Sequence, residues 1–224
     1  MTMQSNVWRP GPVFPDAIRQ LVARFEASKT QSPETRYGYR SVEAQLRNDF
    51  LDTFFETLGW DMRNQRSNPR EVLVEQDIPE SREKVDYSFR IAGQPKFFVE
   101  AKRAEAGDLQ ARDVVNQITE YSKKSHVRIV ILTNFEHFVV YGWCSRPSRK
   151  GPPRFREVGR ITCGEYEHWW GKIDGMFSRQ AVEQGRLDEI VAWIEQFDGN
   201  VNLFSDQQAG PRRSEEHTSE LQSQ

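Results

Sequence analysis

The stretch from Lys96 to Lys102 (KFFVEAK) constrains the fold more than any other part of the chain. Its Phe and Val residues are typical of a buried β-strand. Side chains of a strand alternate between the faces of a sheet, so Glu100 and Lys102 share one face with Phe98. Charges on a core strand are costly unless they are paired or hold a metal ion. The pattern therefore indicates either a salt bridge at a strand end or a functional site.

Composition narrows the class of protein. With 37% hydrophobic and 29% charged residues, the 224-residue chain suits a soluble globular domain with its own core. A net charge of −2 gives no general attraction to nucleic acid, so a DNA-binding surface must be local. Cys144 and Cys163 show no metal-like spacing and predict reduced thiols. We find no signal peptide and no membrane-spanning apolar run, which predicts a cytoplasmic protein without a membrane partner.

Hydrophobic periodicity predicts helices and strands in alternation. The segment 144–160 is rich in Pro, Gly and Arg and predicts a basic loop. The order predicts an α/β (α+β) fold, with a mixed sheet of about 4–5 strands flanked by helices and followed by C-terminal helices. We expect helices over 16–27, 41–58, 108–124, 164–178 and 186–197, and strands over 71–78, 85–91, 96–102, 127–133 and 138–143.

Polar residues of these elements form a set suited to phosphodiester hydrolysis. Carboxylates on adjacent strands, Asp86 and Glu100, can share one hard divalent ion such as Mg²⁺. Lys102 can orient or deprotonate a water, or hold the scissile phosphate. Gln117 suits positioning of the phosphate or the water. The alternative is that these residues are only surface charges, and that Glu43 and Arg47 on the helix over 41–58 form an ordinary i,i+4 ion pair.

The connection between the two strands sets a condition for this site. A strict two-residue turn at Gly93-Gln94 would place Asp86 opposite Ala101, on the wrong face. For Asp86 to lie beside Glu100, we expect an odd-length loop or a β-bulge near Asp86.

The order of these residues resembles the PD-(D/E)xK nuclease superfamily, whose core is α-β-β-β-α-β. More narrowly, residues 34–197 resemble the N-terminal nuclease domain of type IIG restriction-modification enzymes, to which a domain of type I restriction subunits is related. Val85 stands where the superfamily motif has Pro. The matching text is YRSVEAQLRNDFLDTFFETLGWD from Tyr39 to Asp61, VDYSFRIAGQPKFFVEAKR from Val85 to Arg103, the helix from Gln117 to Tyr121, and ILTNFEHFVVY from Ile131 to Tyr141.

The resemblance implies a metal-dependent endodeoxyribonuclease that uses Mg²⁺ or Mn²⁺ and acts on double-stranded DNA. By position, Asp86, Glu100, Lys102 and Gln117 would be catalytic, and Glu43, Asp86 and Glu100 would hold the metal. Two alternatives stay open. One is a catalytically silent DNA-binding or interaction module of the same fold, and the other is a repair or mobile-element nuclease.

Local basic residues are the candidates for DNA contacts, since the carboxylates repel phosphate until a metal is bound. We expect part of the loop over 144–160 to lie on the same side of the sheet as Glu100, although a solvated loop is an equal alternative. The candidates are Arg103, Lys123, Lys124, Arg146, Arg149, Lys150, Arg154 and Arg156.

The sequence composition at the two ends of the chain predicts segments that are separate from the central domain. We expect a lead-in and helix over 1–33, a nuclease domain with C-terminal helices over 34–200, and a disordered tail over 201–224. Residues 213–224 resemble a translated sequencing adapter, which predicts that the natural gene continues past residue 212. The chain holds no P-loop, which argues against an ATP-driven motor, and no Asn/Asp-Pro-Pro-Tyr motif of a methyltransferase. The resemblance to type IIG enzymes therefore implies that methyltransferase and target-recognition regions lie downstream.

Overall fold

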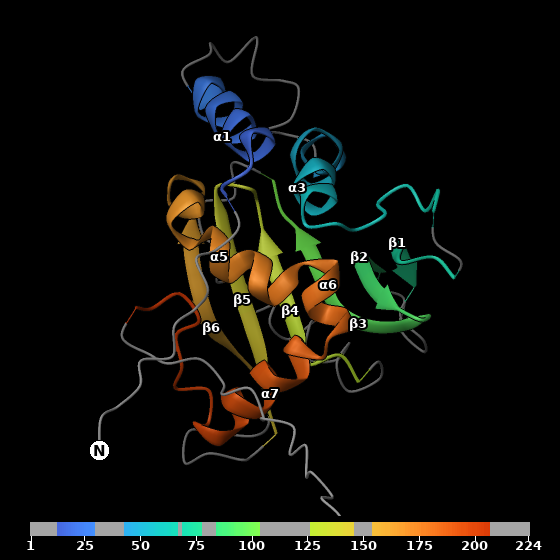
Figure 1. The fold of residues 1–224 in the computed structure, drawn as a ribbon, viewed down its shortest axis with the longest axis vertical. Coiled ribbons are helices and arrows are strands. Elements are labelled where there is room, and N and C mark those ends of the chain that lie inside the picture. The colour runs from blue at the N-terminus through green and yellow to red at the C-terminus, as the bar shows by residue number, and fades with distance from the viewer. Residues whose placement is uncertain are drawn as a thin grey trace, which may run out of the picture.

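A computed structural model describes residues 13–29, 43–66, 69–77, 84–103, 126–145 and 154–206. In this part of the chain, six strands form one mixed sheet in the order of the sequence, flanked by helices, which is an α+β fold (Figure 1). Neighbouring strands are antiparallel except for the third and fourth, which are parallel. The strands are β1 (Val72–Asp77), β2 (Lys84–Ile91), β3 (Gln94–Ala101), β4 (Ile129–Thr133), β5 (His137–Cys144) and β6 (Arg154–Thr162).

The described helices confirm the predicted ones near 16–27, 41–58, 164–178 and 186–197, while the helix predicted over 108–124 lies outside the described residues. The second helix contains a π-helical segment that periodicity does not reveal. In the described ranges, no helix has the length and apolar character needed to cross a membrane. The helical elements are α1 (Asp16–Lys29), α2 (Glu43–Leu46), the π-helix η1 (Arg47–Leu51), α3 (Asp52–Thr57), the 3₁₀-helix η2 (Cys163–Glu165), α5 (Tyr166–Phe177), α6 (Arg179–Glu183) and α7 (Arg186–Gln196).

The sixth strand corrects the predicted loop over 144–160, because β5 runs to Cys144 and β6 begins at Arg154. The apolar residues Phe155, Val158 and Ile161 of β6 recur every three positions. A register shift opposite Val140 and Tyr141 breaks the two-residue period of this strand, so the pattern does not identify it.

The segment after α7 is packed further than predicted, while residues 207–224 of the predicted tail lie outside the described residues. Residues 201–206, placed by sequence in a disordered tail, lie against β6, where the Leu203 amide donates to the Val158 carbonyl at 2.7 Å. Leu203 and Phe204 are both buried.

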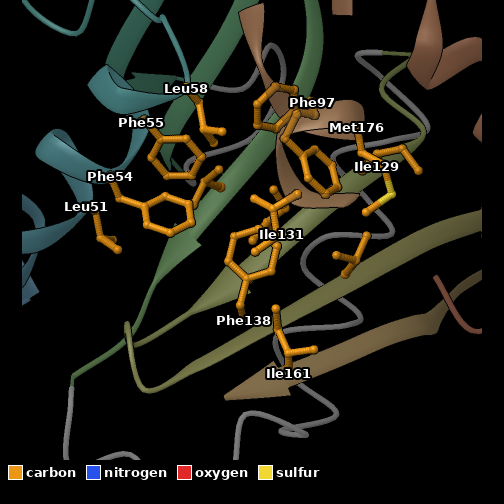
Figure 2. Close-up of a cluster of buried hydrophobic side chains, with 14 of the residues drawn as sticks. Leu51, Phe54, Phe55, Leu58, Phe97, Ile129, Ile131, Phe138, Ile161 and Met176 are labelled. Atoms are coloured by element: carbon orange, nitrogen blue, oxygen red, sulfur yellow. The ribbon is translucent and has the colours of Figure 1, made fainter. Parts of the chain in front are cut away.

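The main core lies between the helices and one face of the sheet. Figure 2 shows Leu51, Phe54, Phe55 and Leu58 of η1, α3 and the turn after it facing strand residues, while Met176 of α5 lies across the cluster beside Ile129. A second apolar cluster lies on the opposite face and includes Phe98, Val130, Leu132, Val139 and Tyr141. Strands β3 and β4 are therefore buried on both faces. Alternation places Glu100 on the second face, with Phe98.

The β2–β3 hairpin meets the condition for a shared site. Its turn is Ala92-Gly93, with φ of +49° and +79°, and Ile91 pairs with Gln94. A bulge follows, since Arg90 pairs with Pro95 whereas Phe89 pairs with Phe97. The extra residue in β3 shifts the pairing by one position, so Asp86 falls opposite Glu100 and not opposite Val99. A bulge is thus present as expected, but it lies beside the turn, between Phe89 and Arg90, and not next to Asp86.

The turn supplies a first prediction. Left-handed backbone costs roughly 1–2 kcal/mol for a residue with a Cβ atom, so Gly93→Ala should lower the free energy of unfolding by about 1 kcal/mol. Ala92→Asn should raise it slightly, because Asn-Gly suits a two-residue turn of this hand. Urea denaturation of both variants measures the effect. A neutral Gly93→Ala variant would argue against this turn.

Candidate functional site

The site forms where strands β2 and β3 separate. Their pairing ends at Tyr87 and Val99, one residue before Asp86 and Glu100 would face each other. Beyond this point the side chain of Asp86 takes the place of a backbone acceptor on β2. Its Oδ2 accepts a hydrogen bond from the Ala101 amide of β3 at 2.7 Å. The carboxylate is thereby held against the end of β3, next to Glu100.

Lys102 completes the group at the end of the same strand. Its ammonium Nζ donates to Glu100 Oε1 at 2.7 Å. Its backbone amide donates to the Thr133 carbonyl of β4 at 2.8 Å, which holds the chain in place just beyond β3. The structure thus brings together Asp86, Glu100 and Lys102 on one face.

Glu100 is the unusual member of this group because it is charged, buried and only partly satisfied. The residue is 8% exposed, and its second oxygen Oε2 has no hydrogen-bond partner among the described residues. Burial raises the pKa of the Glu100 carboxyl, and the negative charge of Asp86 raises it further, while Lys102 opposes both effects. The ionised form of Glu100 is therefore disfavoured in this site, and a cation bound at its second oxygen would offset that cost.

Arg47 is a neighbour of the site that sequence reasoning missed. The sequence offered an ion pair of Arg47 with Glu43 only as an alternative, and the Glu43 side chain lies outside the described residues. In the structure, Arg47 Nη1 donates to Asp86 Oδ1 at 2.7 Å, and Nη2 donates to Glu75 Oε1 at 2.9 Å. Burial lowers the pKa of Arg47, but the bond to Glu75 and the charge of Asp86 outweigh it and raise the pKa above its usual value.

The remaining predicted site residues are described only in part. Arg103 follows Lys102 directly and is exposed. Glu43 and Arg154 lie at the starts of α2 and β6, without described side chains. Outside the described residues lie Gln117, Lys123, Lys124, Arg146, Arg149 and Lys150.

Arg156 lies away from the other site residues. Its Nη2 is 3.9 Å from Asp198 Oδ2, and its side chain is next to Cys144 and Gly199. Cys144 belongs to the helix-covered cluster, so Arg156 lies on the face opposite to Glu100. We therefore leave Arg156 out of the proposed DNA surface.

The described residues contain no group of three or more His, Cys, Asp or Glu side chains arranged to hold a metal ion. The candidate ligands in this part of the chain are thus the two carboxylates of Asp86 and Glu100.

The electrostatics of Glu100 supply a second prediction. A carboxyl whose pKa is raised by folding penalises the folded state at pH above that raised pKa, and the penalty vanishes below the unfolded pKa. Glu100→Gln should therefore stabilise the metal-free protein at neutral pH, on the order of 1 kcal/mol, and have little effect near pH 3. Urea denaturation in EDTA at both values measures this. Destabilisation at neutral pH would show that Glu100 is already satisfied.

Comparison with known proteins gives one informative similarity. No family model matches the chain, and no solved structure matches it. The chain is 28% identical over 207 residues to the type II restriction enzyme and methyltransferase RM.Eco57I of Escherichia coli, an alignment that covers 80% of this chain and 20% of that protein. The chain thus spans about a fifth of the length of the curated relative. The similarity supports a relationship to restriction systems.

Proposed function

We propose that this chain is a Mg²⁺-dependent DNA endonuclease domain of the PD-(D/E)xK superfamily, acting in a restriction-modification system. The observation that carries the proposal is the convergence of Asp86, Glu100 and Lys102 where β2 and β3 separate. The relative, named a restriction enzyme and methyltransferase, supports the same class. Methyltransferase activity and target recognition would belong to other regions of a longer protein.

The two carboxylates fit a hard divalent cation. Glu100 Oε2 is a buried acceptor without a donor among the described residues, and carboxylate oxygens are the ligands that Mg²⁺ and Mn²⁺ prefer. Asp86 and Glu100 would hold the ion, with Glu43 as a further ligand. Bound there, the ion would neutralise phosphate charge and make a water molecule more acidic.

The protein groups would divide the remaining work. Lys102 is fixed by its bond to Glu100, so its ammonium can orient the attacking water or hold the scissile phosphate. Asp86 is fixed by the Ala101 amide, which keeps its carboxylate beside Glu100. Gln117 would position the phosphate or the water.

The buried oxygen of Glu100 also separates this proposal from a catalytically silent DNA-binding module. Leaving a buried polar group without a partner costs roughly 1–3 kcal/mol, and more for a charged group. In a module that only binds DNA, nothing would offset this free-energy cost. In a metal-binding nuclease, the bound ion would offset it by coordinating the buried oxygen.

Cleavage supplies the third prediction. Lys102→Ala and Asp86→Ala should each reduce Mg²⁺-dependent nicking of plasmid DNA by about 10²-fold or more, the range for loss of a positioned catalytic group. Lys84→Ala, on an exposed residue of β2, is the matched control and should cleave like the parent. Calorimetry should show that Asp86→Ala also loses Mg²⁺ binding. Parental cleavage by both site variants would place the activity elsewhere.

DNA binding supplies the fourth prediction. Arg103 is exposed beside Lys102, so we propose that it contacts a phosphate near the scissile bond. Arg103→Ala should reduce the slope of log K against log salt by about 1, since each phosphate contact contributes about −0.9 on duplex DNA. Affinity measured across a salt series tests this, with Arg63→Ala as the control because Arg63 is exposed beside Glu56. An unchanged slope for Arg103→Ala would exclude that contact.

A further inference from the structure

Arg47 reaches the candidate site from the helical segment that precedes the sheet. Its guanidinium lies between the carboxylates of Asp86 and Glu75, at 2.7 and 2.9 Å. Its Cζ atom also lies 5.9 Å from the centre of the Tyr87 ring. The Arg47 side chain is only 12% exposed, so these contacts form largely away from bulk water.

The π-helical segment explains how this contact is made. The amide of Asp52 donates to the carbonyl of Arg47, five residues earlier. Asp52 in turn accepts from the Tyr87 hydroxyl at 2.7 Å. Bonding over five residues brings Arg47 and Asp52 to one side of the helix, where they contact the consecutive residues Asp86 and Tyr87. A regular α-helix, with 3.6 residues per turn, would separate their directions.

A second irregularity lies on the other side of Arg47. Glu75 has φ of +49° in the middle of β1, between Val74, which pairs with Tyr87, and Gln76, which pairs with Val85. A non-glycine residue in this conformation is strained and persists only where its surroundings require it. The left-handed backbone at Glu75 and the π-helical segment that contains Arg47 thus both contribute to the ion pair between these two residues.

We propose that Arg47 is a positioning residue that fixes the Asp86 carboxylate beside Glu100, with Glu75 as its anchor; this assignment rests on the proposed function. Asp86 then has a fixed donor on each oxygen, Arg47 on Oδ1 and the Ala101 amide on Oδ2. A carboxylate held from both oxygens cannot rotate away from Glu100, which keeps it in position for a shared cation. The planar fork of Arg suits a bridge between two carboxylates, which Lys cannot copy.

Mg²⁺ binding by the intact chain, measured by calorimetry without DNA, tests this role. Arg47→Met should weaken binding by about 10–100-fold, the usual effect of losing a group that orients a metal ligand. Glu75→Gln should weaken it less, and Arg47→Lys should lie between Arg47→Met and the parent. Arg24→Gln is the matched control, since Arg24 bonds the Asp49 carbonyl of the same π-helical segment and should leave the affinity unchanged.

A second measurement needs no metal. Amide hydrogen exchange at Ala101 should speed up in Arg47→Met, because the Asp86 carboxylate that accepts from this amide loses its bond to Arg47. The Lys102 amide, bonded to Thr133, should exchange as in the parent. If the parent protein does not bind Mg²⁺ but exchange at the Ala101 amide still speeds up in Arg47→Met, the proposed metal site is wrong. The positioning of Asp86 by Arg47 is then still supported.

Three results would overturn the proposal. The first is a folded Arg47→Met variant with parental Mg²⁺ affinity and parental exchange at Ala101. The second is tighter Mg²⁺ binding by that variant, which would make Arg47 a competitor of the cation. The third result matters if Arg47→Met does not fold. In that case, parental Mg²⁺ affinity in both Glu75→Gln and Arg47→Lys would overturn the proposal.

Discussion

The hydrogen bond from the Ala101 amide to Asp86 depends on one extra residue in β3, and the rest of the site depends on that bond. Without the bulge between the hairpin turn and Phe97, Asp86 would face Val99 and lie on the helix-covered face. With it, Asp86 meets Glu100 on the face that also carries Phe98. The aromatic pair of Phe89 and Phe97, stacked at 4.5 Å between centroids, lies directly beyond the bulge and stabilises the shifted register.

This register creates an electrostatic cost that the fold has to offset. Glu100 is buried beside a like charge, with Lys102 as a direct partner and one oxygen without a donor. The apolar residues on both faces of β3 and β4 supply the opposing free energy, since burial of each large side chain contributes about 1.5–3 kcal/mol. A site that is unfavourable in the empty protein is thus held in place by a core that does not take part in the chemistry.

The sequence predicted the elements with clear periodicity and missed those whose backbone is irregular. Asp86, Glu100 and Lys102 could be identified because each lies in, or directly after, a strand with a clear apolar pattern. The register condition also called for an odd-length loop or a bulge between the two strands. The contact of Arg47 could not be predicted, because it needs a π-helical segment and a left-handed residue at Glu75, and neither leaves a pattern in the sequence. Strand β6 was missed for the same reason, since its bulge hides the two-residue period.

The site residues described in the structure come from one continuous part of the chain, yet that part does not stand alone. Trp60 donates to the Phe177 carbonyl at 2.8 Å, and the Arg179 amide donates to the Leu58 carbonyl at 2.9 Å. Arg179 also bonds Glu71, just before β1. These contacts join the turn after α3 and the start of β1 to helices α5 and α6 (Figure 1). Because α3 continues from the π-helical segment, and β1 carries Glu75, the C-terminal helices hold both supports of Arg47. The geometry at Asp86 therefore depends on packing between segments more than a hundred residues apart in sequence.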